Sequence, residues 1–314
     1  MKPIYLDLSG ARALGDAICS TPTIKKLYDS YGQKINVFSQ YPELFRKNPY
    51  VDKNFHSKDI QVDYVKENFI YHNSFHNIGQ KNQWDVEMKH NNMDIRQFHA
   101  INLGFMLIKD EMELDYRPNT ICTIPNLPKK YVLIHPVQNW ESRTWPAKNW
   151  QMLTQLLNEK GIHVVSIGKD SSELGGSNVD KPVFNFPIKL GLNLMNKTSL
   201  DETWHLINRC SCFVTMDSGL LHLAGTTDCE ILQLGSSINP EFRSPYRHGS
   251  QEYKYHYVRG GCDLHCASDM KYGVREWGSI QGIPSLVDCL ERKKTFECHP
   301  SVLQVYKKIL DIIS

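Results

Sequence analysis

Three polar segments of the sequence carry side chains suited to binding an anion and moving a proton. Asp16 follows the first apolar stretch, Arg143 lies in a polar loop, and the third segment runs from Asp217 to His222. A carboxylate such as Asp16 could accept a proton as a general base. A guanidinium such as Arg143 could bind an anion through two parallel hydrogen bonds. These residue types suit acid–base chemistry on a substrate that carries a phosphate.

The third segment joins a predicted strand to a predicted helix. Ser218 and Gly219 are small residues at the expected helix N-terminus, where backbone N–H groups and the helix dipole favour a phosphate. His222 lies one turn further along, on the side of Ser218. The segment therefore predicts an anion-binding turn.

Each segment also has a purely structural interpretation. Asp16 could be a helix N-cap, which stabilises a helix by about 1 kcal/mol. Arg143 could be a solvated surface arginine in an aromatic corner, and Asp217 or Ser218 could cap the next helix. A single His222 in a helix is compatible with a buried structural histidine. Position alone does not decide between these alternatives.

Alternating strands and helices must position these side chains. The expected strands are residues 4–8, 34–38, 131–135, 163–167, 212–215 and 230–234. The expected helices are residues 16–31, 95–108, 149–159, 200–209 and 220–225. Residues 40–95 predict short strands and long loops. This alternation predicts an α/β fold with parallel sheets, in which ligands bind at the carboxyl ends of the strands.

A change in the sequence pattern divides the chain into two predicted Rossmann-like domains that face each other across a cleft. Residues 118–130 contain three prolines and lack helical periodicity, so we expect them to be the linker. Residues 1–117 form the expected N-terminal, acceptor-side domain. Residues 131–314 form the expected nucleotide-binding domain, with a cysteine-rich segment at 262–298 and a terminal amphipathic helix at 300–313.

Composition excludes several classes of protein. The 314 residues carry 36 Lys and Arg against 34 Asp and Glu, a net charge of +2, which disfavours a nucleic-acid coat or a polybasic membrane binder. No apolar run approaches the roughly 20 residues that span a bilayer. The first ten residues contain Asp7 and predict a strand rather than a secretion signal. With nine cysteines, an odd number, we expect a cytoplasmic protein with reduced thiols.

Four of the cysteines gather near the end of the chain. Thiolates at Cys262, Cys266, Cys289 and Cys298 could hold a tetrahedral zinc or iron ion. Their spacing departs from paired C-x2-C motifs, and four unrelated thiols are the alternative. His265 and His299 are alternative ligands. We expect a metal here to be structural, because this tail is poor in regular core pattern.

Four spaced segments, taken in order, resemble glycosyltransferase family 9, the ADP-heptose heptosyltransferases. They are Leu14-Gly15-Asp16 with Thr21-Pro22, Ile134-His135-Pro136 with Arg143-Thr144-Trp145-Pro146, residues 196–200, and residues 216–222. The resemblance implies the GT-B architecture, inverting transfer, and a nucleotide held mainly by the second domain. It implies Asp16 as the base. It implies donor binding by His135, Arg143, Asp217, Ser218, Gly219 and His222.

The cysteine-rich tail resembles the bacterial autotransporter heptosyltransferases, a branch of that family with a four-cysteine iron-binding finger. This chain has three residues between Cys262 and Cys266, where that branch is expected to have two. Its N-terminal region is short for the extra domain of those enzymes. The resemblance therefore implies a structural iron or zinc ion without implying a protein acceptor.

The leading hypothesis is an inverting transferase that moves a heptose-like sugar from a nucleoside diphosphate, with ADP-heptose favoured, to a hydroxyl. The acceptor would be a surface glycan, a lipopolysaccharide core or a protein. No Asp-x-Asp motif lies between a strand and a helix, so we expect no catalytic metal. Two alternatives stay open, a glycosyltransferase of modified DNA bases with residues 72–99 as its acceptor face, and a nucleotide-binding scaffold without turnover. An oligomer is compatible with either.

Overall fold

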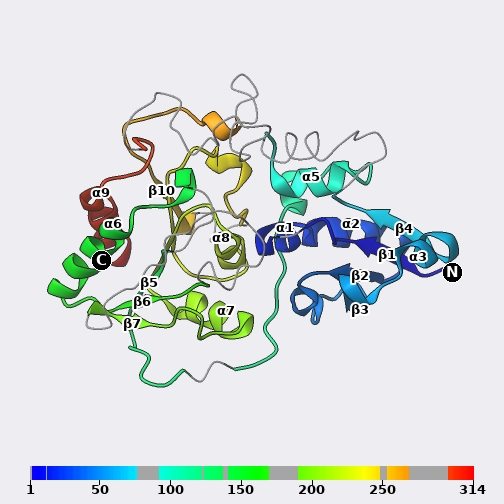
Figure 1. Ribbon diagram of the computed structural model, residues 1–314, viewed down its shortest axis with the longest axis horizontal. Coiled ribbons are helices and arrows are strands. Elements are labelled where there is room, and N and C mark those ends of the chain that lie inside the picture. Colours follow the sequence, from blue (N-terminus) through cyan, green and yellow to red (C-terminus); the bar gives the residue numbers. More distant parts are fainter. Residues whose placement is uncertain are drawn as a thin grey trace.

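The fold is described from a computed structural model of the chain (Figure 1). The structure describes residues 2–11, 13–75, 92–121, 124–136, 141–169, 190–247, 253–268 and 296–314. Within these residues the strands form two parallel sheets of four and six strands. Below, the described part of residues 2–116 is called the N-terminal lobe and that of residues 131–314 the C-terminal lobe.

The sheet of the N-terminal lobe has the strand order β3-β2-β1-β4. Its strands are β1 (Ile4–Asp7), β2 (Ile35–Ser39), β3 (Val51–His56) and β4 (Ile70–Asn73). Its helices are α1 (Leu14–Cys19), α2 (Thr21–Tyr31), α3 (Val62–Asn68) and α5 (Ile95–Ile101). Because β1 lies between β2 and β4, the loop after β1 leaves the sheet at a topological switch point, where α/β sheets bind ligands.

The sheet of the C-terminal lobe has the strand order β10-β9-β8-β5-β6-β7. Its strands are β5 (Val132–His135), β6 (Val164–Ser166), β7 (Leu192–Asn193), β8 (Cys212–Thr215), β9 (Ile231–Leu234) and β10 (Tyr255–Val258). Its helices are α6 (Ala147–Glu159), α7 (Leu200–Arg209), α8 (Gly219–Ala224) and α9 (Val302–Ile313). The switch point lies between β5 and β8, so the loops after β5, β8 and β9 meet at one edge.

Both faces of the second sheet are buried, as expected for a parallel sheet. Successive residues of β5 alternate between two apolar clusters. Val132 and Ile134 pack with Trp145, Trp150 and α9, while Leu133 packs on the face covered by α7 and α8. The apolar cluster that contains Leu133 continues through α1 into the core of the N-terminal sheet. The two lobes therefore share apolar packing, and α1 and α8 lie together at their junction (Figure 1).

The predicted elements are largely confirmed, and two expected helices have other bounds. Residues 40–95, expected to hold short strands and long loops, also contain the helix α3. The helix expected at residues 16–31 is broken at Ser20, because Pro22 has no N–H for the Ile18 carbonyl and the Thr21 hydroxyl donates to that carbonyl instead, at 2.8 Å. The helix expected at residues 95–108 ends at Ile101. Gly104 adopts a left-handed φ of 80° and the Phe105 N–H bonds the Ala100 carbonyl, which closes the helix.

No helix among the described ranges is long and apolar enough to cross a bilayer.

Substitutions at two neighbouring glycines can test how tightly the segment at Gly260 packs against residues 297–299. A Cβ on Gly260 would lie 2.1 Å from the Glu297 carbonyl oxygen, whereas a Cβ on Gly261 would meet nothing within 4 Å. Gly260→Ala should lower the free energy of unfolding by about 1–3 kcal/mol through overpacking. Gly261→Ala should change it by less than about 0.5 kcal/mol. Urea unfolding of both variants measures the difference, and equal stability would contradict this packing.

Candidate active site

Asp16 lies in the first turn of α1, just beyond the carboxyl end of β1. The N-cap of this helix is Ala13, so the interpretation of Asp16 as an N-cap is wrong. The Asp16 side chain is half-buried, and it lies on the lobe opposite to the Asp217 segment. A carboxylate in a first helical turn is stabilised in its charged form by the helix dipole.

The Asp16 turn and the Asp217 segment meet at a pair of glycines. A Cβ on Gly219 would lie 3.0 Å from the Gly15 backbone nitrogen and 3.0 Å from Leu14 Cβ. A Cβ on Gly15 would lie 3.0 Å from His222 Cδ2. The absence of a Cβ at Gly15 and Gly219 therefore favours the close approach of α1 and α8. This contact brings His222 onto the turn that holds Asp16.

His222 is enclosed at this junction. Burial lowers its pKa to about 4, although the nearby Asp217 charge acts in the opposite direction. Arg243 and Arg96 also lower the pKa of His222, and Asp16 raises it. His222 is therefore uncharged at neutral pH. Its neutral ring can take part in hydrogen bonding without adding charge to the site.

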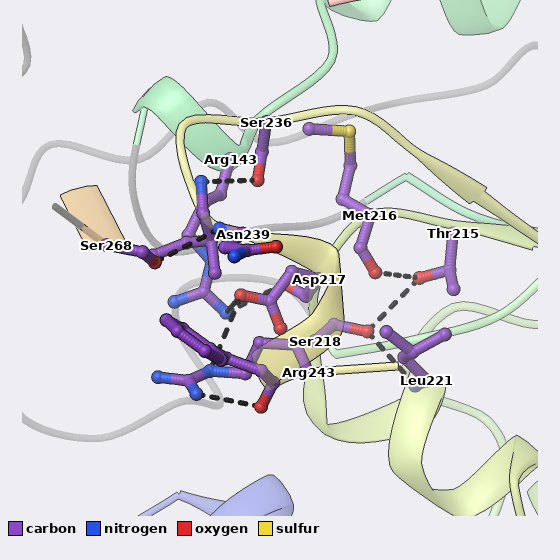
Figure 2. A network of polar contacts seen from close by, with 12 residues as sticks. Arg143, Thr215, Met216, Asp217, Ser218, Leu221, Ser236, Asn239, Arg243 and Ser268 are labelled. Atoms are coloured by element: carbon purple, nitrogen blue, oxygen red, sulfur yellow. Dashed lines mark hydrogen bonds and ion pairs between the residues drawn. The ribbon is translucent and has the colours of Figure 1, made fainter. Parts of the chain in front are cut away.

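Asp217 is a buried carboxylate, and two arginines lie near one of its oxygens (Figure 2). Arg143 Nη2 lies 3.2 Å from Asp217 Oδ2 and donates to the Asp217 backbone carbonyl at 2.8 Å. Arg243 Nε lies 4.0 Å from the same Oδ2. The strand order explains this grouping, since Asp217 follows β8 while the two arginines follow its neighbours β5 and β9. Two guanidinium groups and one carboxylate give the cluster a net charge of +1.

His135 supports the Ser218 turn from the end of β5. Its Nδ1 lies 3.1 Å from Thr215 Oγ1 and 3.3 Å from Ser218 Oγ. Burial lowers the pKa of His135 to about 4, so this ring is uncharged as well. The Ser218 hydroxyl accepts the Leu221 N–H at 3.3 Å and caps α8 (Figure 2). The structural interpretation of Ser218 as a cap is thus confirmed, and α8 is only six residues long.

The loop that carries Arg143 is anchored by the end of the chain. The Trp145 indole donates to the Pro300 carbonyl at 2.9 Å, and His299 Nε2 lies 2.8 Å from the Ser142 carbonyl oxygen. Trp145 also packs edge-to-face against Trp150, with ring centroids 4.8 Å apart. The residues before α9 therefore hold the Arg143 loop in place.

The described cysteines do not by themselves form a metal site. Cys262 and Cys298 lie on adjacent segments, since the Cys262 N–H donates to the Glu297 carbonyl at 3.3 Å and the Gly260 N–H to the Cys298 carbonyl at 3.0 Å. Among the residues placed by the structure, no three His, Cys, Asp or Glu side chains are grouped so as to hold a metal ion. Cys289 lies outside the described residues. The four-cysteine metal site stays a prediction.

Two arginines near the site were not anticipated from the sequence. Arg243 lies in a loop after β9, between Pro240 and Pro245. Its position after the carboxyl end of a parallel strand is the sequence signal that could have identified it. Arg96 is buried at the start of α5 and bonds both carboxylate oxygens of Asp94. Both contribute to the electrostatic environment of His222.

The sequence profile of glycosyltransferase family 9 (heptosyltransferase) matches residues 52–262. The chain belongs to glycosyltransferase family 9. Lipopolysaccharide heptosyltransferase 2 of Salmonella typhimurium is 31% identical over 126 residues, which are 37% of this chain and 36% of that protein. The chain thus matches about a third of the length of this curated family 9 relative.

Solved structures of glycosyltransferases share the fold. The iron-containing dodecameric glycosyltransferase TibC from enterotoxigenic E. coli superposes with a TM-score of 0.68 at 15% identity, over 99% of this chain and 76% of TibC. TibC in complex with ADP-D-beta-D-heptose gives a TM-score of 0.66. The family 9 protein of Veillonella parvula gives a TM-score of 0.66 at 13% identity, over 99% of this chain and 97% of that protein. The predicted GT-B fold is confirmed.

The burial of His135 and His222 predicts a loss of stability in acid. Both have a folded-state pKa of about 4, whereas an unfolded histidine titrates near 6.5. The unfolded chain therefore binds more protons between these values, and the free energy of unfolding should fall by about 2–3 kcal/mol per histidine as the pH drops from 7 toward 4. Denaturant unfolding at a series of pH values measures the slope.

His135→Gln should flatten this pH dependence, because it removes one of the two groups. The control is His163→Gln, which changes an exposed histidine and should leave the slope as in the wild type. An unaltered slope in His135→Gln would mean that His135 is protonated equally in both states.

Proposed function

We propose that the protein is an inverting glycosyltransferase that moves a heptose-like sugar from a nucleoside-diphosphate donor to a hydroxyl group. The observation that carries the proposal is the contact of two lobes at Gly15 and Gly219. It places the Asp16 turn of one lobe against the Asp217–His222 segment of the other. A general base and a cationic cluster then lie on opposite sides of one junction.

In the proposed reaction the acceptor hydroxyl gives its proton to the Asp16 carboxylate as its oxygen attacks the anomeric carbon. The bond between that carbon and the diphosphate oxygen breaks on the opposite face, so the configuration inverts. The diphosphate leaves with the bonding electron pair and gains negative charge. The Arg143 side chain is 20% exposed and belongs to a cluster of net charge +1, which supports its role in stabilising that charge.

The donor-binding role extends to the residues around Arg143. His135 and Ser218 hold the turn after β8, and Asp217 orients Arg143 through its backbone and side-chain oxygens. Gly219 and His222 form the contact with Gly15. The complex of TibC with ADP-D-beta-D-heptose favours ADP-heptose as the donor.

The chemistry of the site supports transfer without a catalytic metal. Asp217 is engaged by two arginines, and cationic side chains can stabilise a leaving diphosphate as a divalent cation would. The iron of TibC supports a separate structural metal at Cys262, Cys266, Cys289 and Cys298. The dodecameric state of TibC makes an oligomer part of the proposal.

For the acceptor, we propose only a chemical class, a hydroxyl group of a glycan or a protein. The names of the curated relatives favour a lipopolysaccharide or related surface glycan, and a protein hydroxyl remains part of the proposal. Much of the DNA-facing segment proposed at residues 72–99 lies outside the described residues. We propose a cytoplasmic location, where nucleoside-diphosphate sugars and reduced thiols coexist.

Asp16→Asn tests the proposed base. The amide cannot accept the acceptor proton, so transfer should fall by at least about 100-fold while nucleotide binding is retained. Sugar transfer from ADP-heptose and calorimetric ADP binding are measured on the same sample. The control is Asp29→Asn on an exposed position of α2, which should match the wild type. Loss of ADP affinity in Asp16→Asn would assign Asp16 to the donor instead.

Arg143→Ala tests the proposed diphosphate contact. Removal of a charge-assisted hydrogen bond should weaken ADP binding by about 1.5–3 kcal/mol. Thermal unfolding with ADP, UDP, GDP and CMP reports both affinity and nucleotide choice, since a ligand at about 100 times its Kd adds about 2.7 kcal/mol of stability. The exposed Arg209→Ala variant is the control. Equal stabilisation of Arg143→Ala and wild type by ADP would remove Arg143 from the site.

A further inference from the structure

A segment of the C-terminal lobe, residues 239–247, reaches across to the N-terminal lobe and is called the arm below. It follows β9 and begins with the short helix η6 (Pro240–Phe242). The Tyr246 hydroxyl donates to Asp110 Oδ1 at 3.4 Å, and Lys109 Nζ lies 5.2 Å from the centroid of the Tyr246 ring. The arm therefore contacts the chain that follows α5.

Arg243 forms a second contact between the arm and the N-terminal lobe. Its Nη1 donates to the Met93 carbonyl at 3.2 Å, two residues before α5. The same nitrogen donates to the Phe242 carbonyl at 3.0 Å, which fixes the guanidinium relative to the arm (Figure 2). The Arg243 side chain is 4% exposed, so it has little freedom to choose other partners.

The other side of the Arg243 guanidinium faces the donor segment. Its Nε lies 4.0 Å from Asp217 Oδ2, the oxygen that also pairs with Arg143. One planar group thus connects the N-terminal lobe, the arm and the carboxylate that orients Arg143. A rigid fork of N–H donors can serve several partners at once, which a flexible lysine ammonium cannot reproduce in the same geometry.

We propose that Arg243 is a positioning residue that couples the arrangement of the lobes to the binding of the donor diphosphate. The hydrogen bond to the Met93 carbonyl fixes the position of Arg243. Arg243 in turn positions the Asp217 carboxylate, and Asp217 keeps Arg143 in its donor-binding orientation. The coupling to the donor rests on the proposed function. The contact between the lobes stands independently of it.

The proposal is tested with Arg243→Gln and Arg243→Lys in the full chain. In Arg243→Gln, ADP binding measured by calorimetry should weaken about tenfold, because Asp217 then no longer holds Arg143 in its orientation. The radius of gyration of the unliganded protein, measured by small-angle X-ray scattering, should rise as the lobes separate. Arg243→Lys keeps the charge but not the fork of donors, so its ADP affinity should stay reduced and its radius of gyration should stay raised.

The matched control is Arg247→Gln. Arg247 is also 4% exposed, but it donates to the Cys229 and Ala224 carbonyls within its own lobe. It should lose stability without a change in radius of gyration or ADP affinity. If Arg243→Gln folds and keeps the wild-type ADP affinity and radius of gyration, the proposal is overturned. It is also overturned if Arg247→Gln changes the ADP affinity and the radius of gyration as much as Arg243→Gln does.

A measurement on the wild-type protein guards against variants that do not fold. Because coupling between sites is reciprocal, ADP should slow backbone hydrogen exchange at residues 92–101, on the opposite lobe. Unchanged exchange there at saturating ADP overturns the coupling. If no nucleoside diphosphate binds the wild type, the proposed function fails, whereas the radius of gyration of Arg243→Gln still decides whether Arg243 holds the lobes together.

Discussion

The site depends on a carboxylate that is removed from water beside two guanidinium groups. Asp217 is 1% exposed, and a buried charge is tolerated only when it is paired. Its two partners lie on loops that follow the two strands flanking its own, so the strand order β9-β8-β5 assembles the cluster. Breaking such a buried pair typically costs about 3–5 kcal/mol, because the remaining charge is left uncompensated. The cluster is thus a structural constraint as much as a binding device.

The junction of the lobes poses an electrostatic problem of its own. The first turns of α1 and α8 approach each other at Gly15 and Gly219, so two sets of partly positive helix N-termini face one another. Asp16 in the first turn of α1 and Asp217 before α8 place negative charge at each of them. Both helices are six residues long, which keeps their dipoles small. The Asp16 carboxylate therefore offsets the partial positive charge at the start of α1, whereas the Asp217 carboxylate also pairs with Arg143 and Arg243.

Much of this arrangement could be predicted from the sequence, because it depends on local patterns. α7 and β8 have the predicted bounds, and the turns that carry Asp16, Arg143 and Asp217 lie at strand ends as expected. The early end of α5 depends on a left-handed glycine that an otherwise helical pattern concealed. The contact of His222 with Gly15 and the role of Arg243 join residues far apart in the chain. No periodicity of a single sequence encodes such contacts, which the strand order and the packing of α1 on α8 create.

The charge of the site follows from arginine and aspartate alone. His135 and His222 are held uncharged by burial, so their protonation does not alter the field around Asp217 at neutral pH. The Arg143–Asp217–Arg243 cluster has one positive charge in excess, and a bound diphosphate would offset it. Both arginines lie near Asp217 Oδ2, and two positive charges beside this oxygen disfavour its use as a ligand of a divalent cation. The same pairing that keeps the carboxylate stable in the interior thus favours a donor site in which the protein's own cations meet the diphosphate.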